Sequence, residues 1–558
     1  MHEEAALPRV FDVLADTFAQ EEVTTCFALL GDANMNWATR LEECGCRFIY
    51  VRHEHCAVAA AMAYARKTRS VGVASVTCGP GVTQLMTALP AAVRASLPLV
   101  VFAGEAPLKS AWYNQGIDQA PLVTGTGAAY HSLHFPSGMP TAIRDAFLQA
   151  RTERRPVVLG IPFDLQNLAW EGDVVLPAPS RTLGGPPSPL PPAKSEVARA
   201  VQLVAGAKRV VVFAGQGAVE SGAGQACRDL AAKTGGLLTT TLPARGLFHD
   251  DPFCIGITGS FSTEVGLECL KQADLIVAVG GSLAFHAGGG GQLWPNAEVL
   301  HIDIEPRSVS QGQTVASHHL RADARLGVEA IMAALPASAP SWRDNELADR
   351  IRTEPADSAN FDVEPGLLDP REAVAALEEA LPSEWELVNS SGHCSAFFAQ
   401  MPSRTNERFL TIREYGAIGN GTSFAMGVAA ARPDSPVVLF DGDGSMLMHI
   451  QELETIQRHG MNILIVVMND GAYGSEVHKL RSEGLSETGA VFGFADFAGI
   501  ARGFGLHGRT ITDITDIPAA LEEFSRGGGA TVWDVRVSDK VVSRITRQAH
   551  PPRVLQQF

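Results

Sequence analysis

The sequence predicts an α/β protein with three units, each a doubly wound parallel sheet covered by helices. Its 558 residues exceed what a single hydrophobic core holds, which indicates several domains. Short apolar runs alternate with helical patterns along the whole chain, as in parallel sheets buried on both faces. Two stretches rich in Pro divide this alternation into segments of ordinary domain size.

The strand predictions rest on short runs of Val, Ile, Leu and Phe. Most of these runs end in Gly or a polar turn residue and lead into a helical pattern, as βα units do. The runs include 47–52, 71–77, 97–103, 209–214, 273–279, 299–304, 437–440 and 463–468.

The domain boundaries follow from two breaks in the pattern. Residues 177–194 read PAPSRTLGGPPSPLPPAK, which is typical of a stiff linker. Residues 336–370 are rich in Pro, Asp and Glu and form the second break. We therefore expect domains at 1–175, 195–335 and 368–558.

The balance of charge argues against some partners. The chain has 61 acidic and 44 basic residues, and no run of Lys or Arg offsets the net charge of -17. This speaks against nucleic acids and anionic membranes. The N-terminus has acids where a signal peptide needs bases, and no apolar run is long enough to span a membrane. Because the nine Cys are scattered without a C-x-x-C pair, we expect reduced thiols in a cytoplasmic protein.

A glycine-rich turn in the third unit indicates a phosphate site. The run 437–440 leads into Asp441-Gly442-Asp443-Gly444-Ser445, and a helical stretch is expected from Met446 to about His459. Glycines at such a turn let the backbone approach a phosphate, and the start of a helix favours its charge.

A second acid, which follows the next apolar run, indicates a metal site. The next run, 463–468, ends at Asn469-Asp470-Gly471, so Asp443 and Asp470 both stand at carboxyl ends of strands. Ligands bind at that edge of a parallel sheet. Two carboxylates together with diphosphate oxygens suit Mg²⁺. Either acid alone would be interpreted as a helix cap or turn residue, but the pair at this spacing favours the metal.

These residues resemble the signature of thiamine-diphosphate (ThDP) enzymes of the acetolactate synthase, pyruvate decarboxylase and benzoylformate decarboxylase type. The resemblance implies that Asp443, Asp470 and the carbonyl of Ala472 hold Mg²⁺ on the diphosphate. Asp470 stands where the family usually has Asn, and its extra charge predicts tighter binding of Mg²⁺. The positions implied to bind the cofactor are Glu54, Gly416, Ile418, Gly442, Asp443, Gly444, Ser445, Asp470, Ala472 and Tyr473.

Glu54 matches the glutamate with which this family contacts the pyrimidine ring of the cofactor. It lies in Arg52-His53-Glu54-His55-Cys56-Ala57 and opens a nearly apolar helix. Apolar neighbours raise the pKa of a carboxyl group, which suits proton exchange with a ring nitrogen. Without the second motif, the residue would be interpreted as an acid that favours the start of a helix.

Two further segments carry the resemblance. Residues 75–83 are similar to the synthase turn, with Cys78 where that family has Ser. In the segment 414–421, Ile418 matches the apolar side chain over which the cofactor bends, and Gly416 matches the glycine whose carbonyl accepts a hydrogen bond from the cofactor. Isoleucine at this position is typical of decarboxylases, whereas synthases tend to carry methionine.

Five residues are the candidates for catalysis. Beside Glu54, Asp32 lies in a turn that resembles the acid turn of pyruvate-decarboxylase-type enzymes, and Glu476 stands where those enzymes place their second acid. Gln115 aligns with a catalytic glutamine of the synthases. His286 is a candidate substitute for the histidines that decarboxylases carry elsewhere. Each of these residues alone could equally be a surface or structural residue.

The middle unit resembles the nucleotide-type central domain of the family. Glycine-rich turns follow the runs 209–214 and 273–279, which alone is weak evidence for a nucleotide. Residues 281–285 replace the flavin contact of acetolactate synthases. FAD is therefore not expected.

The sequence favours a ThDP- and Mg²⁺-dependent enzyme that decarboxylates a 2-oxo acid, with aldehyde release or with acetolactate-synthase-like carboligation. Small 2-oxo acids or aldehydes are the expected partners. The resemblance implies a homodimer or homotetramer whose sites lie between the first domain of one subunit and the third domain of another. Three alternatives remain open: a 2-hydroxyacyl-CoA or oxalyl-CoA type lyase, a pyruvate-oxidase-like flavin oxidoreductase, and a non-catalytic nucleotide-binding module. Glu54 together with the Asp443/Asp470 pair argues against the last.

Overall fold

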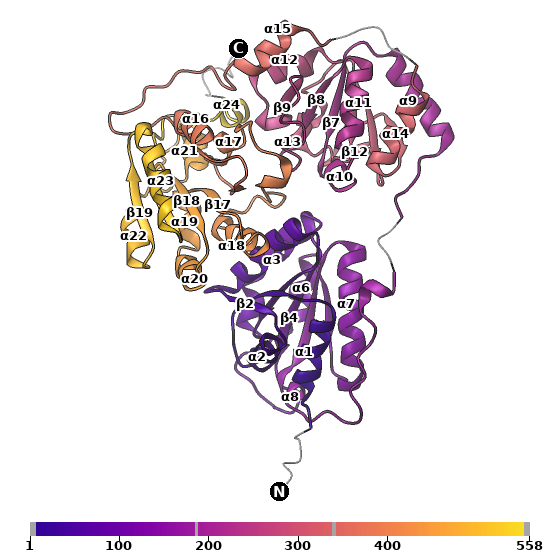
Figure 1. Ribbon diagram of the computed structural model, residues 1–558, viewed down its shortest axis with the longest axis vertical. Helices are drawn as coiled ribbons and strands as arrows, with labels where there is room; N and C mark the ends of the chain where they lie inside the picture. The colour runs from indigo at the N-terminus through magenta and orange to yellow at the C-terminus, as the bar shows by residue number, and fades with distance from the viewer. Residues whose placement is uncertain (1–6, 185–187, 337–341, 552–558) are drawn as a thin grey trace.

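The computed structural model describes residues 7–184, 188–336 and 342–551, which form three α/β domains (Figure 1). In Figure 1 the first domain, in indigo and purple, lies at the bottom. The central domain, in magenta, is at the upper right, and the third, in orange and yellow, is at the left. Each domain contains a six-stranded sheet whose strand pairs in the described residues are all parallel. The predicted fold class is confirmed.

The sheet of the first domain has the strand order β2-β1-β3-β4-β6-β5. Its neighbouring residues Val100 and Val101 face opposite sides, as the period of two in a strand requires. On the side of Val100, α1 (Val10–Gln20), α2 (Met35–Glu43) and α7 (Met139–Glu153) cover the sheet. On the side of Val101, α3 (Glu54–Thr68) and α5 (Ala88–Arg94) cover it. The strands are β1 Thr25–Ala28, β2 Arg47–Tyr50, β3 Gly72–Val76, β4 Leu99–Glu105, β5 Ala129–Ser132 and β6 Pro156–Pro162.

The central sheet has the order β14-β11-β10-β7-β8-β9. The two predicted glycine-rich turns follow its neighbouring strands β7 and β10, and they pack directly on each other. The N–H of Gly217 donates to the carbonyl of Gly280 at 2.8 Å, and a Cβ on Gly215 would lie 2.3 Å from that oxygen. This close approach is what requires glycine here. The strands are β7 Val210–Ala214, β8 Leu237–Thr240, β9 Cys254–Ile257, β10 Leu275–Val279, β11 Glu298–Asp303 and β14 His318–Arg321.

The third sheet has the order β16-β15-β17-β18-β20-β19. One face is covered by α18 (Gly421–Ala431), α20 (Glu452–Arg458) and α22 (Phe497–Gly503). The other face is covered by α16 (Pro370–Ala380) and α23 (Ile517–Gly527). Central β17 and β18 are therefore buried on both sides, which explains their continuous apolar runs. The strands are β15 Glu386–Asn389, β16 Phe409–Leu410, β17 Val437–Gly442, β18 Ile463–Asn469, β19 His507–Ile511 and β20 Thr531–Arg536.

The helix expected from Met446 to about His459 was wrong in its bounds. The structure has α19 (Asp443–Met448), which begins on the glycine-rich turn itself, and then α20. The chain leaves the helical conformation at His449, with φ -134° and ψ 39°. This backbone is held because Nδ1 of His449 donates to the carbonyl of Gly419 at 2.8 Å.

The second segment that was expected to be a linker contains a helix. Within it lies α15 (Asn345–Thr353), whose Leu347 is buried against the central domain. Residues 337–341 of this linker and residues 185–187 of the first linker lie outside the described residues.

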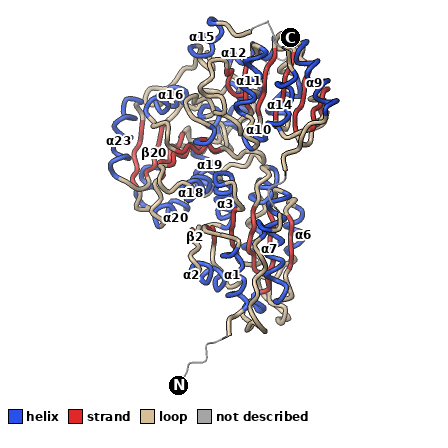
Figure 2. The backbone as a smooth tube through the Cα atoms, turned by 45° about the vertical axis from the view of Figure 1, so that its right-hand side comes forward, coloured by secondary structure: helices blue, strands red, loops and turns tan. Residues whose placement is uncertain are grey.

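The first and third domains share one apolar core. Helix α3 packs along α18, and Figures 1 and 2 both show the two helices side by side. Ten of the fifteen residues of α3 are buried, most of them Ala. A Cβ on Gly427 of α18 would lie 2.2 Å from the carbonyl oxygen of Ala60, so the two backbones meet closely. Beside this core, the buried Glu386 pairs with Lys67 at 2.7 Å and with Arg408 at 2.8 Å.

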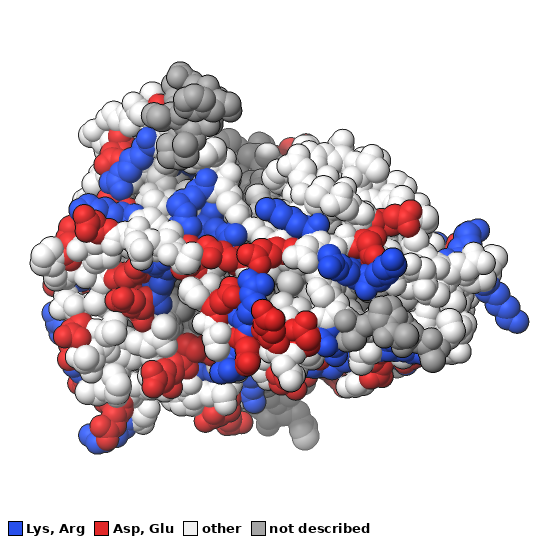
Figure 3. Space-filling model, turned by 90° about the horizontal axis from the view of Figure 1, so that it is seen from above, with Lys and Arg blue, Asp and Glu red and all other residues white. Residues whose placement is uncertain are grey.

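The surface is mixed in charge. On the face seen in Figure 3, Lys and Arg lie among Asp and Glu instead of gathering in one basic patch. Among the described residues, no helix has both the length and the apolarity needed to cross a membrane.

Candidate active site

A cavity opens at the carboxyl ends of β15, β17, β18 and β20. This is the edge at which parallel sheets bind ligands. The site residues that the sequence predicted and that line this cavity are Ile418, Gly442, Asp443, Gly444, Ser445, Asp470, Ala472, Tyr473 and Glu476.

Asp443 is the most strongly held carboxylate of the cavity. Its Oδ2 accepts hydrogen bonds from the N–H groups of Gly471 at 2.7 Å and Ala472 at 3.2 Å. Its Oδ1 accepts from Gly444 at 2.7 Å. Only 2% of the residue is exposed, and burial raises the pKa of Asp443 to about 6 in spite of these donors.

Asp470 lies beside Asp443 at the end of the neighbouring strand. Burial, and then the charge of Asp443, raise the pKa of Asp470 well above its ordinary value. The charge of Asp443 opposes the ionisation of Asp470, and a divalent cation would relieve this repulsion. Two carboxylates at one sheet edge are a donor set that fits Mg²⁺, which takes few protein ligands and completes its shell from phosphate and water.

The turn 416–420 forms another wall of the cavity. Ile418 lines the cavity, whereas Gly416 lies in the turn outside the lining, with φ +72°. The N–H of Gly419 donates to Oγ of Ser445 at 2.9 Å. This bond fastens the turn that carries Ile418 to the glycine-rich turn that carries Asp443.

His393 lines the cavity and was missed by the sequence analysis. The backbone N–H of Ser543 donates to its Nε2 at 2.9 Å, so the proton of the neutral ring is on Nδ1. Burial lowers the pKa of His393 well below its usual value, and the neighbouring His478 adds to this effect. A Cβ on Gly474 would lie 3.3 Å from Nδ1 of His393 and 2.7 Å from Oδ2 of Asp470, which places this N–H near the carboxylate pair.

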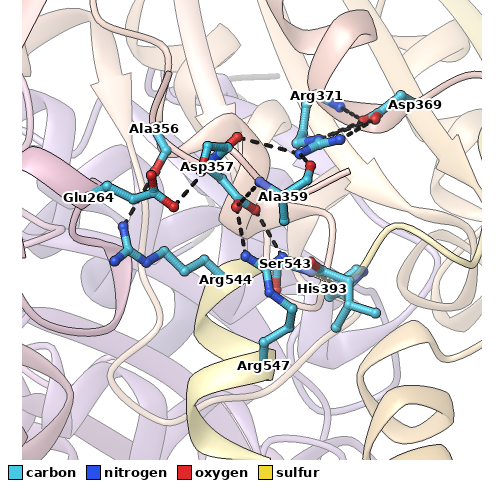
Figure 4. A network of polar contacts seen from close by, with 12 residues as sticks. Glu264, Ala356, Asp357, Ala359, Asp369, Arg371, His393, Ser543, Arg544 and Arg547 are labelled. Atoms are coloured by element: carbon cyan, nitrogen blue, oxygen red, sulfur yellow. Dashed lines mark hydrogen bonds and ion pairs between the residues drawn. The ribbon is translucent and has the colours of Figure 1, made fainter. Parts of the chain in front are cut away.

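The C-terminal segment forms one side of the cavity. Val537, Ser538 and Val541 line it, and α24 (Arg544–Ala549) follows. Figure 4 shows how this helix is tied to the linker before the third domain. Arg547 donates to both carboxylate oxygens of Asp357, at 2.6 and 3.0 Å. The apolar run of β20 ends at the same sheet edge as β17 and β18. This run could have predicted from the sequence that the segment after it lies at the cavity.

A second cluster lies at the carboxyl edge of the first sheet. Glu54 begins α3 and is half-buried, and burial raises the pKa of its carboxyl group. Gly81, in the predicted turn 75–83, lies against it, since a Cβ there would be 3.7 Å from Oε1 of Glu54.

The structure also brings Asp32 and Gln115 to this edge. The hydroxyl of Tyr113 donates to Asp32 at 3.4 Å, and Sγ of Cys78 donates to Oε1 of Gln115 at 3.4 Å. Three of the candidate catalytic residues thus belong to the first domain.

The two clusters lie in different domains. The lining of the cavity comes from the third domain, and none of Glu54, Asp32 and Gln115 is part of it. His286 lies elsewhere, exposed on the short helix α13 (Phe285–Gly288) of the central domain.

Comparison with known proteins gives the family. Residues 8–122 match the model described as thiamine pyrophosphate enzyme, N-terminal TPP binding domain. Residues 197–331 match its central domain, and residues 390–535 match its C-terminal TPP binding domain. The acetolactate synthase large subunit of Parasynechococcus marenigrum (strain WH8102) is 30% identical over 91% of this chain and 85% of its own length. The chain belongs to the thiamine pyrophosphate enzyme family.

Other relatives of this ThDP enzyme are also named as acetolactate synthases. Acetolactate synthase 2, chloroplastic, of Zea mays is 29% identical over 94% of this chain and 85% of its own length. The acetolactate synthase isozyme 2 large subunit of Escherichia coli (strain K12) is 29% identical over 93% of each chain. The resemblance inferred from the motifs is confirmed, and the protein is a ThDP-dependent enzyme of the acetolactate synthase type.

Proposed function

We propose that this ThDP enzyme requires Mg²⁺, decarboxylates a 2-oxo acid and joins the remaining acyl unit to a second carbonyl compound, as an acetolactate synthase does. The observation that carries the proposal is the pair formed by the buried Asp443 and the half-buried Asp470 in the cavity at the strand ends. The relatives named as acetolactate synthases, which align over nearly the whole chain, support the reaction type.

In this proposal the third domain holds the cofactor. Asp443 and Asp470 would hold Mg²⁺ on the diphosphate, with the carbonyl of Ala472 as a further ligand. The side chain of Ile418 would support the bend of the cofactor. When bound, ThDP supplies a nucleophilic ring carbon that adds to the carbonyl group of the substrate. Tyr473 and Glu476 line the same cavity, and Glu476 would exchange a proton with the substrate.

The first domain would supply the proton chemistry of the cofactor ring. Because burial raises the pKa of Glu54, its carboxyl group keeps a proton closer to neutral pH and can exchange it with a pyrimidine nitrogen. Asp32 and Gln115, at the same sheet edge, would face the substrate. The proposal includes no flavin, and a yellow purified protein with a flavin spectrum would contradict that part of it.

A homo-oligomer would bring the two clusters together. Large apolar side chains are exposed around the third-domain cavity and around the first-domain cluster, and such patches indicate an interface. On the third domain they are Tyr415, Met448, Tyr473, Phe492 and Phe494, and on the first they are Leu30, Met35, Leu108, Trp112 and Ile117. We infer that the cavity of one subunit faces Glu54 of a partner in a dimer or tetramer.

The first experiment is CO₂ release from a panel of 2-oxo acids, with ThDP and Mg²⁺ added together and singly. Release that needs both additions and is lost in Glu54→Gln supports the proposal. Analysis of the products then separates free aldehyde from a ligated 2-hydroxy ketone. If ThDP binds tightly but no acid releases CO₂, the proposed substrate class is wrong.

A further inference from the structure

Three histidines meet where the first domain packs on the third. His53 and His55 flank Glu54 at the start of α3, and His449 lies in the break between α19 and α20. The rings of His55 and His449 are stacked, with centroids 4.9 Å apart and planes at 11°. The centroid of His53 lies 5.2 Å from that of His449.

The hydrogen bonds give each ring one defined tautomer. Nδ1 of His449 donates to the carbonyl of Gly419 at 2.8 Å. Nε2 of His55 donates to Oδ1 of Asn420 at 2.5 Å. Nδ1 of His53 accepts from the backbone N–H of His55 at 3.1 Å. The accepting Nδ1 of His53 carries no proton, and burial lowers the pKa of all three rings, which favours their neutral form.

This cluster connects residues of two cofactor sites in the proposed oligomer, because Ile418 belongs to the cavity of its own chain and Glu54 would act in the cavity of a partner. On one side it holds the first turn of α3, which carries Glu54. On the other side it holds Gly419 and Asn420, which directly follow Ile418 of the cavity wall. Gly419 also donates its N–H to Oγ of Ser445. The position of Gly419 therefore determines where the turn 416–420 lies and whether this turn is bonded to the glycine-rich turn.

We propose that His55 and His449 are positioning residues that fix the turn 416–420 against the start of α3. They thereby set the place of Ile418 in the cavity and the place of Glu54 at the helix start. The inference rests on the proposed function, because it assumes that Ile418 and Glu54 act on ThDP. His55 and His449 touch neither the cavity lining nor the proposed metal ligands in the described contacts.

The test compares variants that remove each donor with variants that keep it. His55→Leu and His449→Leu remove the donors while keeping bulk. His55→Gln keeps a donor near the position of Nε2, and His449→Asn keeps one near the position of Nδ1. The matched control is His459→Leu, because Nε2 of His459 accepts from the N–H of Tyr50 at 3.1 Å across the same domain junction.

Three quantities are measured on the full chain with Mg²⁺ present. Calorimetry gives the dissociation constant of ThDP, and acid-quench NMR gives the rate of hydrogen–deuterium exchange at its thiazolium C2. Thermal unfolding without cofactor reports on folding alone. The leucine variants should raise the dissociation constant and slow the exchange, each by about tenfold, as expected for the loss of one buried hydrogen bond.

The conservative variants should stay within about twofold of wild type, since they keep the hydrogen bond. His459→Leu should lower the unfolding temperature and leave both cofactor quantities unchanged. The inference is overturned if the leucine variants bind ThDP and exchange at C2 as wild type does. It is also overturned if His459→Leu weakens binding and slows exchange as much as they do. If the leucine variants do not fold, His449→Gln replaces them, since it moves the donor by one bond and should bind ThDP more weakly than His449→Asn. A wild-type protein that does not bind ThDP would instead refute the proposed function, and this inference with it.

Discussion

At the scale of single residues, the Asp443/Asp470 pair is the feature from which most of the chemistry follows. Asp443 is buried and Asp470 is half-buried, and each follows one of two neighbouring strands. Burial raises the pKa of both carboxyl groups, and the charge of Asp443 adds to the rise for Asp470. An amide at position 470 would bring no second charge. Asp470 therefore raises the free energy of the folded protein without cofactor and stabilises the cation-bound site.

The variant Asp470→Asn tests this pair. We expect it to bind Mg²⁺ about tenfold more weakly in the presence of ThDP, because one ionic ligand becomes neutral. Without cofactor, its free energy of unfolding at pH 7 should rise by about 1–2 kcal/mol, because the buried repulsion is gone. Calorimetric titration with Mg²⁺ and urea unfolding measure the two quantities. The exposed Asp349→Asn is the control and should change neither.

The pair also predicts how stability depends on pH. Burial raises the pKa of Asp443 from 3.8 to about 6, so the folded chain binds more protons than the unfolded chain between these values. The contribution of this group to the stability of the cofactor-free protein is fully present below about pH 4 and is lost as the pH rises through about 6. Urea unfolding at a series of pH values should show this fall, and Asp470→Asn should reduce it. Identical profiles for the two proteins would refute the coupling.

Glu54→Gln separates proton exchange from binding. Glutamine has the size of glutamate but cannot give up a proton, so we expect activity to fall by about 10²- to 10⁴-fold. The dissociation constant of ThDP should change little, and thermal unfolding should be unaffected. Steady-state kinetics and calorimetry check the two parts, with the exposed Glu43→Gln as control. Activity near the wild-type level would exclude Glu54 from catalysis.

Residue-level prediction from the sequence worked where a side chain follows a strand. Asp443 and Asp470 could be placed together because parallel strands end at a common edge. His393 could not be placed, because its orientation is set by Ser543, 150 positions later in the chain. Asp32 and Gln115 were predicted as site residues, but the bonds through Tyr113 and Cys78 that hold them depend on loop packing that no spacing reveals.

At the scale of elements, the short helix α24 holds the segment that forms one side of the cavity. Ser543, just before the helix, fixes the tautomer of His393, and Arg547 of the helix is anchored on Asp357 of the linker. The chain is thus held at Ser543 and at Arg547, and the linker takes part in shaping the site (Figure 4).

Arg547→Gln should loosen this segment. Breaking the partly buried ion pair leaves Asp357 without its main partner, and we expect the dissociation constant of ThDP to rise about three- to tenfold. Calorimetry measures this change. The control is Arg352→Gln, which removes an exposed pair with Asp349 and should have no effect. If the two variants bind ThDP equally well, α24 plays no part in holding the cofactor.

The sequence predicted the central strands correctly, but it did not predict the break between α19 and α20 or helix α15. The strands with continuous apolar runs were found because they are buried on both faces. The break at His449 was missed because the residues around it suit a helix, and a tertiary hydrogen bond to Gly419 overrides that preference. Helix α15 was missed because it is short and strongly polar, with Leu347 as its one buried residue, and it lies in a stretch whose composition resembles a linker.

At the scale of the whole molecule, the proposed site residues lie in two domains. The cavity is lined by the third domain, while Glu54, Asp32 and Gln115 lie at the edge of the first. In the proposed oligomer a second chain brings the two sets together, so we expect activity to depend on oligomerisation.

Mixing two inactive variants tests this arrangement. Dimers that contain one Glu54→Gln chain and one Asp443→Asn chain would have one site with both defects and one site with neither. Random co-assembly should therefore restore about a quarter of the wild-type activity in the whole mixture, because half of the dimers are mixed and each has one competent site, and about half in the purified mixed dimers. Co-expression with two affinity tags and activity assays of the doubly purified fraction measure the recovery. If the sites were complete within single chains, no activity would return.

The shared core of α3 and α18 has a consequence for the gene as well as for the protein. Because apolar contact and the buried Glu386 cluster hold the first domain on the third, the peptide link between them is not what keeps them together. Two separately translated polypeptides, one ending with the first domain and one beginning with the central domain, should find each other and assemble. The order in which the three domains are encoded is, in that sense, free to vary without disturbing their arrangement in space.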